Sequence, residues 1–376
     1  MDIPWAEYWW DKITGPHEAV QSVADTLHGG KSVLFVVPDD LPWRHEMRGS
    51  IRAALSSSYG LRDVVITTIY CADDPESSLN PGQYLLKRFA RSRDRLAFRP
   101  GTGGSLQDFL ISREVLKNMV VWVKGVDAES EKTWIDFCSS FRSDTFGNGL
   151  FVIEAHEATS VEHPRLEVID LKEYVSVFDA RLFNSTVVSD YGQELADSYK
   201  RYLTALLTRL CGTDVEVSEY LASCQEEWGL DPRERIALMV EDGMFPNRGL
   251  QSPNHILSLQ RGGRTGELER RVWSAQVEVI YPLIEEERLK LVEEFSEDLD
   301  KILCTSIVEQ FGSRITDRLD VELGTLVSLI ARHKDSFKSS SGRDRAHLLR
   351  DCRNALAHMS CCGESDVTSL LGAARY

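Results

Sequence analysis

The first half of the chain contains five short apolar runs, separated by segments with helical periodicity. The strongest run, at residues 32–40, begins SVLFVV and lacks the apolar–polar alternation of a half-exposed strand, which is typical of strands buried on both faces. The other runs lie at 63–70, 119–126, 149–155 and, more weakly, 166–171, and helical patterns lie at 44–55, 82–92, 106–116 and 130–141. Strands that alternate with helices favour a mainly parallel sheet, so we expect an α/β N-terminal domain at residues 1–185.

The strand signals fade after Phe183, where helical periodicity takes over. A long amphipathic pattern at 194–210 is followed by two shorter helical patterns and then by a segment rich in Pro, Gly and Asn. We expect a small helical or winged-helix-like module and a linker at residues 186–262. A module of this kind is a candidate for binding nucleic acid.

The last third of the chain has helical periodicity throughout. A long apolar stripe begins near Glu267, and Pro282 within it predicts either a kink or the start of a second helix. Two further helical patterns follow. Three or four antiparallel helices of this length form a bundle, so we expect an all-α helical bundle at residues 263–376.

The composition describes an ordinary globular chain, with 42% hydrophobic and 27% charged residues. Its 376 residues exceed what one core usually organises, in agreement with two or three domains. There is no apolar run of membrane-spanning length and no signal-peptide pattern, so we expect a cytoplasmic protein that does not engage a membrane. The eight cysteines are scattered and form no Cys-x-x-Cys pair, so we expect neither a structural metal nor a cofactor.

The charge is strongly negative overall but is segregated along the chain. A formal net charge of −16 opposes nonspecific binding to nucleic acid, so any such contact must rest on a local patch. Residues 331–358 contain seven Lys or Arg against three Asp, whereas residues 267–300 contain eleven acidic residues against four basic ones. The sequence therefore places a basic stretch near the C-terminus.

Residues 343–359, within that basic stretch, predict an amphipathic helix. An apolar stripe is expected from Leu349, Cys352, Leu356 and Met359, which are spaced by three and four residues. At 100° per residue the opposite face gathers polar side chains, with Arg350 beside them and Arg353 at the edge of the stripe: His347, Asp351, Asn354 and His358. Such a face is either a chemical site or a solvated surface.

The order of elements in the N-terminal domain resembles P-loop ATPases of the AAA and STAND type. Such enzymes cradle phosphates with glycines and a lysine after the first strand, but residues 38–49 here read PDDLPWRHEMRG. The triplet Gly30-Lys31-Ser32 precedes the strand, and Asp127 arrives late for a magnesium ligand. We expect a degenerate NTPase-like domain that has lost hydrolysis, or else an unrelated α/β scaffold. The loop GTGG at 101–104 is either a connector or an anion site.

The segment Arg353-Asn354-Ala355-Leu356-Ala357-His358 resembles the signature of the HEPN family of small helical domains. The resemblance covers about the last 110 residues. It implies a dimer in which two such helices form one cleft and, in active members, metal-independent cleavage of RNA. By the same resemblance His358 would be the general acid or base, Arg353 would stabilise phosphate charge, and Asn354 would orient the histidine or bind the phosphate. Arg345, His347 and Arg350 are candidate RNA-binding residues.

Three functional hypotheses follow from these patterns. The first is a regulated HEPN-type endoribonuclease of a prokaryotic defence or toxin system, with RNA as substrate and the N-terminal domain as sensor or site of a protein partner. The second is a non-enzymatic adaptor that dimerises within a larger anti-phage defence complex. The third is a DNA-associated regulator that uses residues 190–262.

Overall fold

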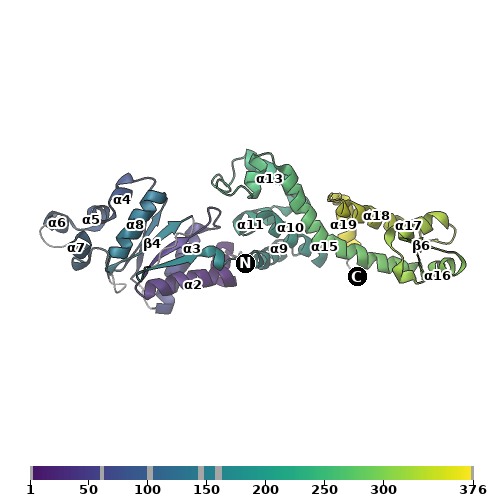
Figure 1. Cartoon of the computed structure of the whole chain (residues 1–376), viewed down its shortest axis with the longest axis horizontal. Helices are drawn as coiled ribbons and strands as arrows, with labels where there is room; N and C mark the ends of the chain where they lie inside the picture. Colours follow the sequence, from purple (N-terminus) through teal and green to yellow (C-terminus); the bar gives the residue numbers. More distant parts are fainter. Residues whose placement is uncertain (1–2, 60–62, 100–104, 143–147, 157–162, 374–376) are drawn as a thin grey trace. The chain divides into compact units, whose positions relative to one another are not determined.

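The computed structural model describes residues 3–59, 63–99, 105–142, 148–156 and 163–373, and the chain forms two compact units, Met1–Phe183 and Asn184–Tyr376 (Figure 1). The expected boundary near residue 262 falls inside the second unit. The loop GTGG at 101–104 lies outside the described residues. Each unit is built around its own core and is described by itself.

The first unit is organised around a five-stranded parallel sheet with the order β2-β3-β4-β1-β5. The central strands are buried on both faces, which explains their uninterrupted apolar sequences, whereas the edge strand β2 is partly exposed. The expected parallel α/β arrangement is therefore confirmed. The strands are β1 (Ser32–Val36), β2 (Val65–Tyr70), β3 (Met119–Lys124), β4 (Leu150–Ala155) and β5 (Leu166–Asp170).

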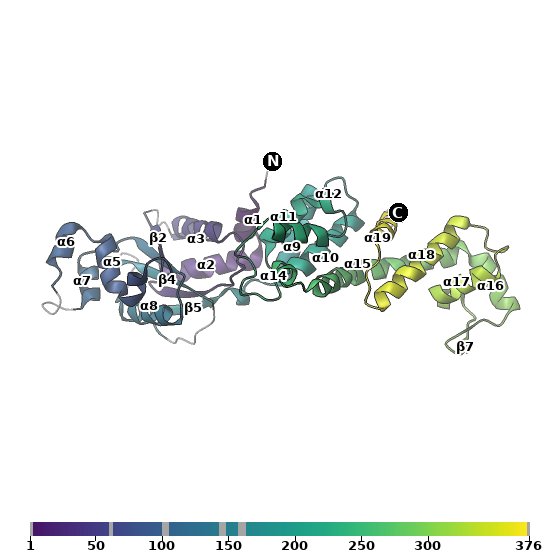
Figure 2. The same ribbon diagram turned by 90° about the horizontal axis from the view of Figure 1, so that it is seen from above.

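Helices cover both faces of this sheet (Figure 2). Helices α2 and α3 pack together on one face, and α8 contacts β4 and β5 on the other. The helices of this unit are α1 (Trp5–Lys12), α2 (Thr14–His28), α3 (Arg44–Tyr59), α4 (Pro75–Leu79), α5 (Pro81–Phe89), α6 (Ser92–Ala97), α7 (Leu106–Ser112) and α8 (Ala128–Ser140). A short 3-10 turn at Leu171–Glu173 precedes α9 (Val177–Tyr191), which crosses into the second unit.

The second unit is mainly helical and is arranged along the 30-residue helix α15 (Thr265–Glu294), which packs against α10 and α18. Pro282 lies inside α15 and does not end it. The other helices are α10 (Asp197–Cys211), α11 (Val215–Ser223), α12 (Gln225–Trp228), α13 (Arg233–Glu241), α14 (Ile256–Arg261), α16 (Ser296–Thr305), α17 (Leu323–Arg332), α18 (Ser340–Ala357) and α19 (Glu364–Ala373).

Two details of the second unit differ from a purely helical bundle. A short antiparallel hairpin, β6 (Glu309–Gln310) and β7 (Ser313–Arg314), and a 3-10 turn at Arg318–Asp320 lie between α16 and α17. Residues 186–262, all of which the structure describes, contain helices and no strand. The winged-helix alternative for that module therefore has no β-hairpin from which to build a wing.

Candidate functional site

Helix α18 carries the residues of the HEPN-like signature. It begins after Ser339, whose hydroxyl accepts a hydrogen bond from the backbone N–H of Gly342 at 3.0 Å, and it ends at Ala357. Leu349, Cys352 and Leu356 are fully buried, as the expected stripe requires. α18 packs mainly against α15 and α17.

The expected stripe does not extend to Met359. This residue is 58% exposed and has a φ of 59°, in the left-handed region. The prediction failed because α18 ends two residues earlier, and a reversal of the chain after a helix turns the next side chain away from the helical face. His358 itself is the residue that caps the C-terminal end of α18.

The predicted polar face of α18 is open to solvent. His347, Asp351, Asn354 and His358 are all exposed. The backbone N–H of His358 donates to the carbonyl oxygens of Asn354 and Ala355, at 3.0 and 3.1 Å. Within the described residues, no side-chain hydrogen bond joins Arg353, Asn354 and His358. The three groups therefore lie within two turns of one helix without forming a closed network.

Arg353 lies beside a small polar pocket of about 330 Å³. Its guanidinium donates to Glu322 Oε2 over 3.4 Å, and both side chains are about one-third exposed or more. The pocket brings together residues of α15, the segment before α17, the first residue of α17, and α18: Tyr281, Glu285, Arg288, Leu319, Asp320, Glu322, Leu323 and Arg353. Carboxylates thus surround the one candidate catalytic cation.

The other candidate cations are also paired within the chain. Arg345 contacts the carboxylates of Glu287 and Glu294 on α15, at 3.6 and 3.1 Å, and Glu287 is almost fully buried. Arg350 bonds its neighbour Asp351 at 2.7 Å. The acidic and basic stretches that are separate in the sequence therefore meet along the α15–α18 contact, and the basic patch is partly neutralised.

A second polar cluster, which the sequence did not reveal, lies at the carboxyl ends of the central strands of the first unit. Glu154 on β4 is buried and accepts hydrogen bonds from Trp122 Nε1 at 2.5 Å and from the guanidinium of Arg44 at 2.9 Å. Lys124 Nζ on β3 lies 3.7 Å from Glu154 Oε1. Burial lowers the pKa of Lys124 to about 8, against the opposing attraction of Glu154.

The cluster occupies the edge of the sheet where α/β proteins bind ligands. A glutamate at the end of an otherwise apolar strand was the only signal for it. Lys124 ends β3, where an NTPase would carry a magnesium-binding acid. Here the buried carboxylate of Glu154 pairs with Arg44 and Lys124. The negative charge that a bound phosphate would bring to these cations is thus already provided by the chain.

The residues considered for a phosphate loop have local partners. Lys31 pairs with Glu167 of β5 at 2.8 Å, and Asp39, just after β1, pairs with the imidazole of His156 at 2.9 Å. Asp127 accepts a hydrogen bond from the backbone N–H of Ser130 at 2.8 Å and so caps α8. Each of these contacts has a structural explanation.

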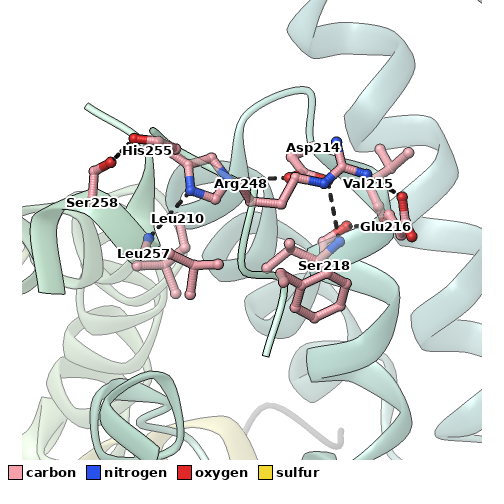
Figure 3. Close-up of polar contacts among 12 residues, drawn as sticks. Leu210, Asp214, Val215, Glu216, Ser218, Arg248, His255, Leu257 and Ser258 are labelled. Atoms are coloured by element: carbon pink, nitrogen blue, oxygen red, sulfur yellow. Dashed lines mark hydrogen bonds and ion pairs between the residues drawn. The ribbon is translucent and has the colours of Figure 1, made fainter. Parts of the chain in front are cut away.

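A third polar cluster fastens the loop between α13 and α14 in the second unit (Figure 3). His255 Nε2 lies 3.1 Å from Asp214 Oδ2, and its Nδ1 accepts a hydrogen bond from the backbone N–H of Leu257. Arg248 extends between Asp214 and Glu216 and forms ion pairs with both. Because Nδ1 accepts a hydrogen bond, the ring proton is on Nε2, and the Nε2–H group donates a hydrogen bond to Asp214. Both ring nitrogens are engaged, so this pair is structural.

Comparisons with protein-family models, with curated proteins and with solved structures found no significant match to this chain. Within the described residues, no group of three or more His, Cys, Asp or Glu side chains is arranged to hold a metal ion. Across the same residues, no helix combines the length and the apolar character needed to cross a membrane.

Proposed function

We propose that the chain is a regulated, metal-independent endoribonuclease of the HEPN type, and that its C-terminal helical region is the catalytic domain. The observation that carries the proposal is the location of Arg353, Asn354 and His358 at the C-terminal end of α18. There His358 is exposed and Arg353 is partly accessible. By the resemblance of its signature, the chain would act in a prokaryotic defence or toxin system.

The chemistry of these side chains suits cleavage of a phosphodiester. An imidazole gives and takes protons near neutral pH, which suits His358 to activate the ribose 2′-hydroxyl or to protonate the leaving oxygen. Arg353 would stabilise the charge that develops on the phosphate. Its ion pair with Glu322 is long and partly exposed, and such pairs are worth about 1 kcal/mol or less, so a phosphate group can displace the carboxylate at low cost.

The active form would be a homodimer in which the exposed faces of two α18 helices meet. The face formed by His347, Asp351, Asn354 and His358 lacks a cover within the described chain, and Met359 adds an exposed apolar side chain at its edge. A two-fold axis brings the same patch of both copies together, so one copy's Arg353 can act beside the other's His358. RNA would then lie in the shared cleft.

The N-terminal unit would act as a sensor or as the docking site of a protein partner. Its parallel sheet supports the resemblance to P-loop NTPases at the level of the fold class only. The loop after β1 has no early glycine, and Glu154 already neutralises the nearby cations. A degenerate NTPase-like role without hydrolysis agrees with both features.

The direct test is to incubate the full chain with total RNA in the presence of EDTA. The wild type should cut RNA, and His358→Ala and Arg353→Ala should each cut about 10²-fold more slowly or worse, as expected for loss of an acid–base group. His45→Ala, which removes an exposed imidazole from α3, is the matched control and should keep wild-type activity. Equal rates for the wild type and the His358 variant would refute the assignment.

The second candidate is a non-enzymatic adaptor that dimerises through the same helical region. It is favoured by the ion pairs that already engage Arg345, Arg350 and Arg353 within the chain. It predicts a stable dimer and stable co-purification with a partner, with RNA left intact. Both proposals include a dimer, so the RNA assay separates them: only the ribonuclease cleaves RNA and loses that activity when His358 is replaced.

A further inference from the structure

Two cysteine thiols meet beside the HEPN-like signature. Cys352 on α18 is 1% exposed, and Cys362, in the loop before α19, is 7% exposed. The Cys362 thiol donates to the carbonyl oxygen of Cys352, with sulfur and oxygen 3.6 Å apart, and the two thiols lie close enough for each to shift the pKa of the other. Contact between two thiols is the first geometric requirement for a disulfide bond.

This contact is set by the packing of the loop onto α15. Gln276 is buried and holds Cys362 at two points: its Nε2 donates to the Cys362 carbonyl oxygen at 3.2 Å, and its Oε1 accepts from the Cys362 N–H at 2.7 Å. Trp273 Nε1 donates to the carbonyl oxygen of Leu356 at 2.9 Å and fixes the end of α18. The Cys362 side chain therefore lies against Cys352 because α15 holds both segments.

The pair also contains an acidified thiol. The hydrogen bond from Cys352 lowers the pKa of Cys362, and the same bond together with burial raises the pKa of Cys352. Burial raises the pKa of the adjacent Cys361 to about 11. Because the thiolate is the reactive form of cysteine, Cys362 is the expected nucleophile among the three.

We propose that Cys352 and Cys362 are a peroxide-sensitive dithiol that forms a reversible disulfide. The Cys362 thiolate attacks one oxygen of hydrogen peroxide, the O–O bond breaks, and hydroxide leaves and takes up the thiol proton as water. The sulfur of Cys352 then attacks the resulting sulfenic acid at the Cys362 sulfur. The S–OH bond breaks and hydroxide leaves with the Cys352 proton, so two thiols are oxidised and one peroxide is reduced to two waters.

The bond would close a short loop that contains all three candidate catalytic residues, Arg353, Asn354 and His358. It would tie the last turn of α18 to the start of α19 and restrict the segment between them. The proposed modification concerns the thiols themselves, so it goes beyond the proposed ribonuclease and does not depend on it.

The experiment treats the full chain with hydrogen peroxide, blocks the remaining thiols with an alkylating agent, and maps disulfides by peptide mass spectrometry. The expected result is a Cys352–Cys362 link that dithiothreitol reverses, with a mass lower by two hydrogen atoms and with two of the eight thiols lost. Hydrogen exchange of residues 353–361 should slow in the oxidised protein. Alkylation of both Cys352 and Cys362 after treatment that oxidises the exposed Cys304 would overturn the proposal.

Two variants sharpen this test. Cys361→Ser leaves the pair intact and should form the link as the wild type does, whereas Cys352→Ser should leave Cys362 to oxidise to sulfinic acid without any link. A link from Cys352 to Cys361 in the wild type would also overturn the assignment. Even where a variant folds poorly, the peptide map of the wild type shows whether the Cys352–Cys362 disulfide forms.

Discussion

Replacement of Lys124 by methionine is expected to stabilise the N-terminal unit, although it removes one partner of an ion pair. Lys124 is only 9% exposed, and burial lowers its pKa from 10.5 to about 8. Since one pKa unit corresponds to about 1.4 kcal/mol, the protein disfavours the charged form by about 3 kcal/mol at neutral pH. A methionine of similar length fills the same space without that cost.

The expected increase in stability requires that Glu154 still has partners once Lys124 is replaced. Glu154 keeps its hydrogen bonds from Arg44 and Trp122, so it is not left unpaired. The matched variant Glu154→Gln should have the opposite effect, because it leaves the buried Lys124 and the half-buried Arg44 without a counter-charge. We expect it to destabilise the unit by about 3 kcal/mol or more.

The same pKa gives the dependence on pH. The pKa of Lys124 is lower in the folded state than in the unfolded state, so between about pH 8 and 10.5 the unfolded chain binds more protons. The stability contribution of Lys124 therefore rises through this window, and the advantage of Lys124→Met shrinks until it vanishes near pH 10.5. The greater stability of Lys124→Met at neutral pH and the loss of that advantage at high pH both follow from the charge on the buried lysine.

Urea unfolding of the full chain, followed by tryptophan fluorescence, measures both effects. The variant should move the transition of the N-terminal unit to higher urea and leave that of the second unit unchanged. A Lys124→Met variant less stable than the wild type would show that the ion pair outweighs burial. An advantage that stays constant up to about pH 10.5 would show that the lysine charge is not its origin.

Three further predictions concern the second unit. Gly342→Ala should destabilise it by about 2 kcal/mol in thermal unfolding, because a Cβ would lie 2.6 Å from the Phe295 ring. Phe311→Gly should stabilise it by about 1 kcal/mol in urea, because Phe311 is 86% exposed and has a φ of 52°. Leu349→Ala should cost about 3 kcal/mol by the same measurement, because Leu349 is fully buried.

Matched variants separate these causes from general effects of substitution. Gly324→Ala on α17 places a Cβ in open space and should stabilise the helix slightly, so equal losses at both glycines would contradict the steric argument. Leu289→Ala removes an exposed leucine from α15 and should change stability by less than about 0.5 kcal/mol. A loss of stability in Phe311→Gly would indicate that the ring packs in solution.

Local periodicity allowed much of the fold to be predicted. The central strands β1, β3 and β4 are buried on both faces, so their apolar runs identified them directly. The face of α18 that carries Leu349, Cys352 and Leu356 was equally clear, because a repeat of three and four residues marks one side of a helix. Met359 escaped this reasoning because periodicity does not reveal the residue at which a helix ends.

The sequence by itself determined the parallel sheet, the helical second half and the polar face of α18, because each depends on contacts within a few turns or on a strand's burial. Only the tertiary structure decided which charges meet. Arg345 pairs with carboxylates of α15 more than fifty residues away. Cys362 lies against Cys352 because Gln276 of α15 holds the loop between α18 and α19. Both contacts depend on packing against α15, which is distant in the sequence, and no short-range pattern records them.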